Sequence, residues 1–234
     1  MGLGFLPVHG GNVEIELNRE WIATNLNIGA DTPYFPQFSA QLNKFSASFN
    51  LDQLDDVLLP RRGYRLRGFY KISSPEFGSD LDYWRANLEA SYYFQVNRLV
   101  TLKIGASFVR SSSSMPIYKY YYYGGPGSYI GTEYNQLVVD RMTILRVAYR
   151  YRYSQQTYLK LVWHTVFDYN FHFADATLGI DANLQCERMQ AVGVGILYMA
   201  PFGPVEITIS QGRESALRPS SHKNYLYFSA GYKF

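Results

Sequence analysis

The chain has 234 residues, of which 18% are charged and 17% are aromatic, and its formal net charge is +3. The positive charge is spread along the chain without a basic block, which argues against nucleic acid as a partner, and Cys186, the single cysteine, excludes an intrachain disulfide. Few charges and 22 tyrosines are not the composition of an average soluble domain. Tyrosine suits a surface that is apolar at one end and wet at the other, as in the aromatic girdles of a membrane barrel.

Residues 1–44 predict irregular first strands. Apolar residues alternate over 13–17 and change phase over 22–28, and the same happens between 38–42 and 45–51. Each pair is either one long bulged strand or two short strands, and we place the second bulge near Asn43. Residues 1–11 lack the basic and apolar regions of a secretory signal, so the chain resembles a mature piece or the downstream part of a longer protein.

The rest of the chain predicts an all-β meander. Apolar and polar residues alternate with period two, and turn signals separate the segments. The segments are 64–72, 84–94, 100–108, 143–153, 158–169, 192–199, 205–210 and 225–234. With the first 60 residues they make about 10 to 12 strands, and the fold class is a transmembrane antiparallel up-and-down β-barrel.

Short and long connections alternate along this meander. Short ones lie at 95–98, 154–157 and 201–204, and long ones at 73–82, 111–140, 171–188 and 211–223. Outer-membrane barrels have short periplasmic turns and long extracellular loops, so this pattern places the C-terminus in the periplasm. The last strand alternates and ends in an aromatic residue, and we expect its apolar face to be the assembly signal, with Phe228, Tyr232 and Phe234.

Basic residues gather on one face of two neighbouring predicted strands, the face expected to line the lumen. They are Arg146, Arg150 and Arg152 on one strand, and Lys160 and His164, together with the acidic Asp168, on the next. One interpretation is a selectivity lining or a latch for an inserted loop. The other is that a barrel interior is polar and its charges pair across strands.

The long segment 116–140 is rich in tyrosine and glycine. Gly124, Gly125, Gly127 and Gly131 permit backbone shapes that other residues resist. Such a segment suits a loop that folds back into a confined lumen, and it equally suits a flexible external loop.

The sequence offers no support for a catalytic or metal site. It contains neither G-x-S-x-G nor an Asp-Gly dipeptide, and its four histidines are scattered. We therefore predict no enzyme activity, no metal and no cofactor in this chain.

Several blocks resemble, in the same order, the barrels of the bacterial surface antigen superfamily of outer-membrane assembly factors and two-partner translocons. The first block, 54–64, resembles the family's D-x-x-x-x-P-x-R-G turn. The others are 77–80, 124–125, 134–137, 149–151, 193–196 and 201–204. The resemblance covers 45–234 and is greatest to the C-terminal barrel of outer-membrane patatin-like phospholipases. Family barrels have about 16 strands, so this chain would form part of such a barrel or a smaller one.

The resemblance implies a lumenal loop whose tip is an Arg-Gly-aromatic motif. Ile130, Gly131 and a threonine stand at that tip here, so the glycine is kept and the arginine and aromatic are missing. Tyr134 and Asn135 follow in the family's order. Arg150 and Asp168 stand where the tip's strand partners are expected. The altered tip fits the patatin branch, in which the barrel serves a fused upstream hydrolase.

The leading hypothesis is thus a barrel of the Gram-negative outer membrane, 1–234, that anchors or translocates a passenger or an upstream domain. The alternative is a small, porin-like diffusion channel, and a barrel-borne hydrolase is a third interpretation. The implied partners are outer-membrane lipid and the barrel assembly machinery. A fused or secreted passenger and a second copy of the chain remain open.

Overall fold

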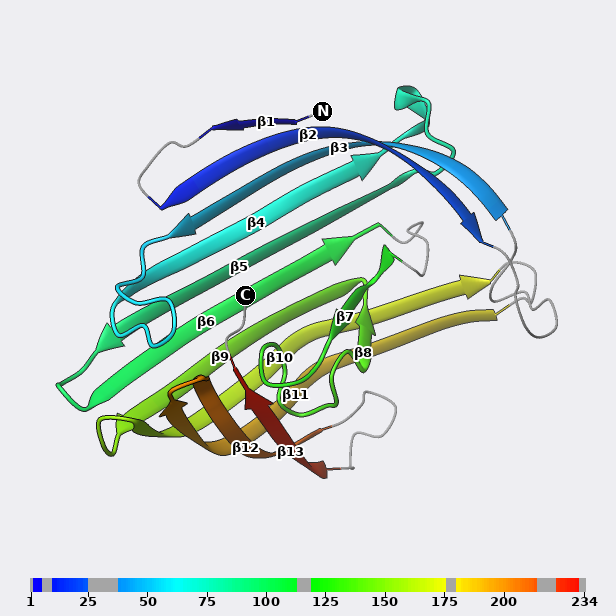
Figure 1. The fold of residues 1–234 in the computed structure, drawn as a ribbon. Helices are drawn as coiled ribbons and strands as arrows, with labels where there is room; N and C mark the ends of the chain where they lie inside the picture. Colours follow the sequence, from blue (N-terminus) through cyan, green and yellow to red (C-terminus); the bar gives the residue numbers. More distant parts are fainter. Residues whose placement is uncertain are drawn as a thin grey trace.

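The protein is one curved antiparallel sheet with a small second sheet lying against it (Figure 1). The computed structural model describes residues 2–5, 10–24, 38–112, 119–175, 180–213 and 222–231. Eleven strands pair in the order β1-β2-β3-β4-β5-β6-β9-β10-β11-β12-β13, and β7 pairs with β8. This agrees with the predicted number of strands and with the predicted meander.

Except for the four-residue β1, the strands of the large sheet are long enough to cross a membrane when tilted. Their bounds are β1 Gly2–Phe5, β2 Gly11–Thr24, β3 Phe38–Asp52, β4 Gly63–Ser73, β5 Tyr83–Gln95, β6 Val100–Ser111, β9 Arg141–Arg152, β10 Thr157–Asp175, β11 Ile180–Ala200, β12 Gly203–Arg213 and β13 His222–Ala230. The small sheet consists of β7 Tyr121–Tyr123 and β8 Leu137–Val139. In the described part of the chain, no helix is long and apolar enough to span a membrane.

The period-two pattern forms strands because it gives the sheet one outward and one inward face. In β9, Tyr149 points outward and is 40% exposed, whereas Ile144 points inward and is fully buried. The outward face of β11 and β12 carries exposed apolar residues such as Val194 and Ile209. An apolar outward face is what a strand in contact with lipid requires.

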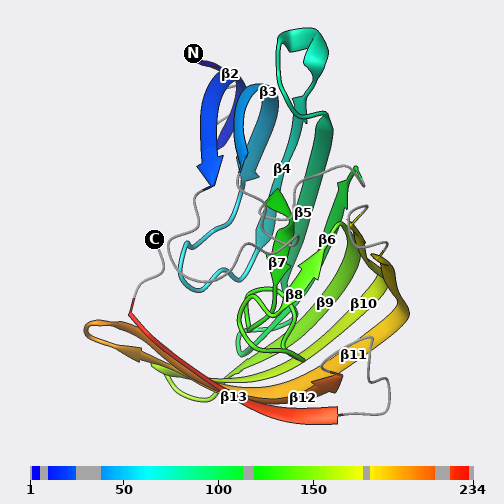
Figure 2. The same cartoon turned by 90° about the vertical axis from the view of Figure 1, so that its right-hand side faces the viewer.

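The sheet bends so that β2 and β3 face β12 and β13 across a concave side (Figure 2). β1 and β13 are its two edges, and no pairing between them is recorded among the described residues. β7, β8 and the segment between them lie inside the curve (Figures 1 and 2). The inward face is therefore partly a packed core.

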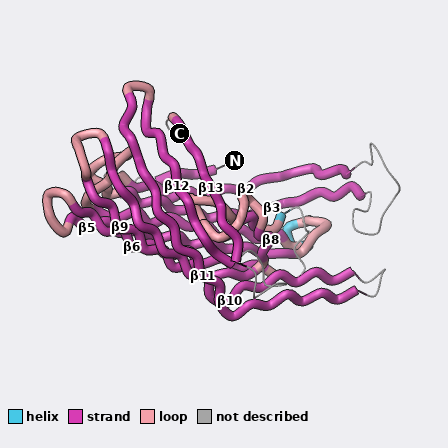
Figure 3. Tube along the Cα trace, turned by 90° about the horizontal axis from the view of Figure 1, so that it is seen from below, coloured by secondary structure: helices cyan, strands magenta, loops and turns pink. Residues whose placement is uncertain are grey.

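The connections fall into two groups, one at each end of the strands. At one end they are 96–99, 153–156 and 201–202, together with the longer turn 53–62. At the other end lie 74–82, with a 3-10 helix η1 at Pro75–Phe77, and the segment 112–140. The predicted long connection at 171–188 is wrong, because β10 and β11 stay paired as far as Asp175 and Ile180. Figure 3 shows this hairpin, and the β2 and β3 pair, projecting beyond their neighbours.

The predicted bulge near Asn43 is also wrong. β2 and β3 pair without a break from Gly11 opposite Leu51 to Thr24 opposite Phe38. The apolar phase changes there because Leu42, fully buried, faces inward and packs with Tyr83 and Tyr120. The residues are regular strand, and this inward apolar position lies beside charged ones, since Glu20 opposite Leu42 pairs with Lys44 and Lys119.

A bulge does occur on β10. Its register against β9 shifts between Phe167 and Asn170, and Asp168 has a φ of 56°. The extra residue reverses the faces beyond it. Tyr169, predicted on the lipid face, is buried in the inner core and donates from its hydroxyl to the Val138 carbonyl at 3.3 Å.

Candidate functional site

The segment 119–140 fills part of the concave side of the sheet. Tyr129 and Ile130 are almost completely buried, and they share one hydrophobic core with the β7 and β8 residues Tyr123 and Val139. The core extends onto the inward faces of β9, β10 and β11 through Ile144, Val166 and Met189, which are also buried. The structure thus places this segment, which we call the lumenal loop, inside the curve.

The tip of the lumenal loop is hydrogen-bonded to three parts of the wall. The Ile130 carbonyl accepts from the Ser210 hydroxyl at 2.6 Å and from the Tyr227 hydroxyl at 3.1 Å. The Ile130 N–H donates to Nδ1 of His164 at 3.3 Å. Tyr227 also donates to the Thr132 carbonyl at 2.6 Å. The tip is therefore held by β10, β12 and β13 through backbone groups.

Small residues on the wall let the tip approach this closely. A Cβ added to Gly212 would lie 2.6 Å from the Gly131 Cα, and one added to Gly193 would lie 3.0 Å from Cδ1 of Ile130. The distance at Gly212 is shorter than real contacts allow. The tip can therefore lie against its seat, the inward faces of β11 and β12 at Gly193 and Gly212, only because Gly131 and Gly212 both lack side chains.

The rest of the loop is shaped by the residues that follow β7. Gly124 has a φ of 138°, and its N–H donates to the Ser128 hydroxyl at 2.7 Å. Asn135 has a φ of 56°, a conformation asparagine tolerates better than most residues. The Tyr134 ring packs against Gly125 and meets the Tyr227 ring edge to face at 5.8 Å. Tyr227 thus contacts the loop by both its hydroxyl and its ring.

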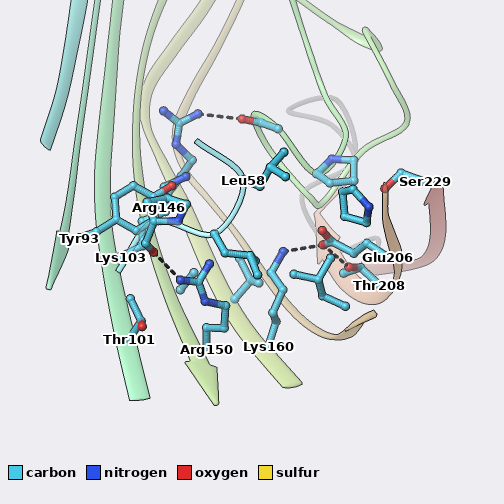
Figure 4. Close-up of a pocket in the computed structure, with 18 of the residues that line it drawn as sticks. Leu58, Tyr93, Thr101, Lys103, Arg146, Arg150, Lys160, Glu206, Thr208 and Ser229 are labelled. Atoms are coloured by element: carbon cyan, nitrogen blue, oxygen red, sulfur yellow. Dashed lines mark hydrogen bonds and ion pairs between the residues drawn. The ribbon is translucent and has the colours of Figure 1, made fainter. Parts of the chain in front are cut away.

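A cavity of about 320 Å³ lies below the tip, and basic side chains line it (Figure 4). They come from neighbouring strands: Lys103 on β6, Arg146 and Arg150 on β9, and Lys160 on β10. Lys160 pairs with Glu206 at 2.5 Å, the acidic residue of the lining. We call this space the basic cavity.

Two connections close the basic cavity from opposite ends. From the loop side, the Gly127 carbonyl accepts from Nη1 of Arg146 at 3.1 Å, while Nη2 donates to the Ser107 hydroxyl at 2.5 Å. From the side of the short turns, the Pro60 carbonyl accepts a hydrogen bond from Arg150. Both arginines therefore act as latches for inserted backbone.

The turn 53–62 is organised by Asp55. Its Oδ1 accepts from the N–H groups of Arg61 at 2.8 Å and Arg62 at 3.1 Å. Burial raises the pKa of this carboxyl, but the hydrogen bonds from the Arg62 and Arg61 N–H groups outweigh it and hold the pKa below its usual range. The first carboxylate of the D-x-x-x-x-P-x-R-G block is thus a turn-forming residue.

The structure brings together some of the predicted site residues and separates others. Arg146, Arg150, Lys160 and His164 line the basic cavity with Gly127 and Ile130. Arg152 lies nearer the turn and its Nε donates to the Ser154 carbonyl at 3.4 Å.

Asp168, expected in the lumen as a strand partner of the tip, is turned outward by the bulge and pairs there with Arg110 at 2.7 Å and Arg141 at 3.7 Å. Phe228 is 64% exposed on the outward face of β13. Tyr232 and Phe234 lie outside the described residues.

Of the three side chains that hold the tip, the sequence indicated His164 but not Ser210 or Tyr227. Ser210 and Tyr227 stood as ordinary inward-facing strand positions, and Lys103 was not singled out among the basic residues. A signal was present in Gly193, Gly195 and Gly212, which leave gaps on one inward face. Among the described residues, no cluster of histidine, cysteine and carboxylate side chains could hold a metal ion.

The comparisons with known proteins agree with this architecture. The family model described as the Omp85 superfamily domain matches residues 23–234. The fold is similar to the crystal structure of BamA from Haemophilus ducreyi lacking POTRA domains 1–3, with a TM-score of 0.74 and 12% identity. The similarity covers 97% of this chain and 52% of that chain, so the chain spans about half the length of that structure.

No curated protein sequence matches the chain. At this low identity the likeness to BamA shows the fold, and the family match shows the relationship. The resemblance to the surface antigen barrels is confirmed. The chain belongs to the Omp85 superfamily, and it is a β-barrel protein of the Gram-negative outer membrane.

Proposed function

We propose that this barrel anchors or translocates a passenger or an upstream domain, and that movement of the lumenal loop controls passage through its lumen. The observation that carries the proposal is the fastening of the Ile130–Thr132 tip to β10, β12 and β13 by hydrogen bonds to backbone groups. A loop seated this closely occupies part of the lumen, so passage of a polypeptide requires that the loop move. A loop that acts as a gate must be held by contacts that can break when it moves.

The latches fit such a gate because they bind backbone carbonyls. Arg146 and Arg150 hold the loop and the 53–62 turn through Gly127 and Pro60. When the two segments withdraw, both guanidinium groups remain in a water-filled lumen, where arginine is readily hydrated. Water can therefore replace these two arginine hydrogen bonds in the open state, which keeps their contribution to the free-energy difference between the two states small.

A reporter fusion tests both parts of the proposal. A small epitope-tagged domain is fused ahead of Met1 behind a secretory signal, and cells are fractionated and treated with protease. Anchoring predicts that the reporter sediments with the outer membrane, and recovery in the soluble fraction contradicts it. Translocation predicts that the tag is cleaved on intact cells.

A locked loop gives the matched control. The pair Ile130→Cys and Gly193→Cys, in a Cys186→Ser background, is designed to join the tip to β11, because a Cβ added to Gly193 would lie 3.0 Å from Cδ1 of Ile130. Oxidation is expected to protect the tag without releasing it from the membrane. Cleavage that is unchanged by the lock would contradict gating by the loop and leave anchoring intact.

A more specific form of the proposal is that the barrel serves a fused upstream hydrolase, as the barrels of the patatin branch do. The notable departure at the tip, Ile130 in place of arginine, favours a barrel that serves a fused hydrolase over an assembly factor. The coding sequence upstream of Met1 decides this point: a contiguous hydrolase domain supports the patatin branch. An upstream sequence without one removes that support.

A diffusion channel is the second candidate, because the lining of the basic cavity favours anions. Lys103, Arg146 and Arg150 face it together with the paired Lys160 and Glu206. Planar-bilayer recording is expected to show anion-selective conductance that falls in the Arg146→Ala and Arg150→Ala variants. Absence of conductance counts against a channel.

The proposed partners also include the barrel assembly machinery and a second copy of the chain. Phe228, Tyr232 and Phe234 are proposed as the assembly signal, and deletion of Phe234 is expected to lower the amount of folded protein in the outer membrane. Cross-linking in membranes tests association between copies.

A further inference from the structure

The outward face of the sheet is apolar over most of its height and carries charge at one end only. Along the described strands, outward positions in the middle and towards the short turns are residues such as Leu161, Val194, Ile207 and Leu226, all more than 45% exposed. Apolar side chains at this exposure indicate contact with lipid chains. The charged outward positions all lie towards the other end, that of the lumenal loop.

These charged residues form what we call the arginine rim. It consists of Arg19, Arg110, Arg141, Arg188 and Arg213, with His222 and the acidic Asp168. The pairing of the strands places them at similar heights: Arg110 lies opposite Arg141, and Arg213 lies opposite His222. The rim is basic, since arginines outnumber its one carboxylate.

Aromatic contacts confirm that the rim faces outward. The Arg110 guanidinium lies 4.2 Å from the centre of the Phe108 ring, and Phe108 is 42% exposed. The Arg19 guanidinium lies 4.9 Å from the Trp21 ring, which is 69% exposed. An arginine above an exposed aromatic ring is the arrangement of a membrane interface, where the ring meets lipid and the cation meets headgroups.

The bulge on β10 adds the acidic residue to the rim. Because Asp168 is turned outward, its carboxylate pairs with Arg110 and Arg141 and holds the two guanidinium groups beside each other. Two arginines that share one carboxylate retain donors for a further anion, since each guanidinium has five N–H groups. This part of the rim is therefore ordered and still basic.

The other part of the rim is hollowed. Arg188, Gln190, Arg213 and His222 line a surface pocket of about 220 Å³. Nη1 of Arg213 lies 3.5 Å from the Arg188 carbonyl oxygen, to which it donates. Among the described residues, the pocket lining contains no carboxylate, and the side chains of Arg188, Arg213 and His222 carry hydrogen-bond donors of the kind that bind phosphate oxygens. The Gln190 amide oxygen accepts from Nε of Arg188 at 2.9 Å, which orders this guanidinium group.

We propose that the arginine rim binds the phosphate groups of lipid headgroups in the outer leaflet, with the pocket of Arg188 and Arg213 as its main site. The long connections mark this end as extracellular, so the rim lies at headgroup level and the apolar face below it receives the acyl chains. A phosphorylated glycolipid with several acyl chains matches both surfaces.

The experiment measures retention of a defined lipid by the full chain, folded in zwitterionic detergent. The probe is diphosphorylated lipid A, with chemically dephosphorylated lipid A in a parallel arm, and bound lipid is quantified by native mass spectrometry. Binding of the phosphorylated form alone, or at least about tenfold tighter, supports phosphate recognition. Equal binding of the two forms overturns it.

Variants locate the site. The double variant Arg188→Gln with Arg213→Gln is expected to weaken the binding of diphosphorylated lipid A by about tenfold or more, because two charge-assisted hydrogen bonds are lost. The control, Arg62→Gln with Arg98→Gln, removes the same charge from the turns at the other end and is expected to leave binding unchanged. Equal effects of both pairs would show a general charge effect and overturn the site.

Each variant is checked for heat-modifiable migration, which reports a folded barrel. If the rim pair does not fold, the single Arg213→Gln variant replaces it, with Arg98→Gln as its control. Unchanged binding in a folded rim variant overturns the proposal. The rim lies on the outward face of the sheet, away from the lumen. The lipid-binding results therefore do not depend on whether the barrel anchors a domain or translocates one under control of the lumenal loop.

Discussion

Tyr227 on the last strand donates its hydroxyl hydrogen to the Thr132 carbonyl at 2.6 Å, so residues 95 positions apart join the lumenal loop to the end of the sheet. The same hydroxyl lies 3.1 Å from the Ile130 carbonyl. Because the side chain is buried, water does not readily replace these bonds. Together with Ser210 and His164, this residue fixes the position of the tip.

Tyr227→Phe removes the hydroxyl and keeps the ring. We expect the tip to be destabilised by about 1 kcal/mol, because the Thr132 and Ile130 carbonyls lose the Tyr227 donor and keep only the Gly125 N–H and the Ser210 hydroxyl. Faster proteolytic cleavage within residues 119–140, in protein folded in detergent, measures the effect. Tyr92→Phe, which alters an outward-facing and 54% exposed tyrosine, is expected to leave cleavage unchanged.

Gly212→Ala is expected to displace the tip, because the new Cβ would lie 2.6 Å from both the Gly131 Cα and the Ala191 Cβ. Overpacking of this kind costs about 1–3 kcal/mol. Oxidative cross-linking of the Ile130→Cys and Gly193→Cys pair would be slower with this substitution than without it. Gly127→Ala is the control, since its Cβ would meet nothing within 4 Å, and an equal effect of both variants would argue against the close fit.

Asp168 variants separate the conformation of the bulge from its ion pairs. Asp168→Asn keeps a residue that tolerates the φ of 56° and loses the charge, so we expect a cost of up to about 1 kcal/mol. Asp168→Val also introduces a β-branched residue in a left-handed conformation and is expected to cost at least about 1 kcal/mol more. Denaturation by urea in detergent compares the two, and equal stability would contradict strain at the bulge.

Asp55 predicts a dependence of stability on pH. Its pKa is lower in the folded protein than in the unfolded chain, so the contribution is present above the unfolded pKa, about 4, and is lost as the pH falls through the folded pKa. The 53–62 turn is expected to become susceptible to an acid protease below about pH 4. Asp55→Asn is expected to remove this pH dependence, and an unaltered profile would contradict it.

The strands could be predicted because each outward face repeats with period two. β9 is the clearest case, since its outward residues from Thr143 to Tyr151 and its inward residues from Ile144 to Arg150 alternate without a fault. The register follows from this alternation, because a shift by one residue would exchange lipid and lumen.

The period-two alternation gave wrong predictions at strand positions where an apolar residue faces inward. Ala40 and Leu42 are apolar and inward, and Tyr120 of the lumenal loop packs with Leu42, but a sequence cannot show which inward positions are covered. The bulge at Asp168 was missed because Asp168 and Tyr169 fit the alternation by residue type, although the backbone shift exchanges their faces.

The candidate site was predicted in part. An inserted loop was one of two interpretations of the glycines in 116–140, and a latch for such a loop was one interpretation of the arginines on β9. The structure places Gly127, Arg146 and Arg150 together at the basic cavity. Ser210 and Tyr227 could not be chosen from the sequence. They are ordinary strand residues that become important because a segment far away in the chain comes to rest on them.

The bond from Tyr227 to the tip also imposes an order on folding. The lumenal loop is synthesised long before β13, yet its tip has no complete seat until β12 and β13 have joined the sheet. Contacts of such sequence separation form late, because the intervening chain must first be ordered. The complete set of contacts at the tip can therefore form only after the last strand has joined the sheet.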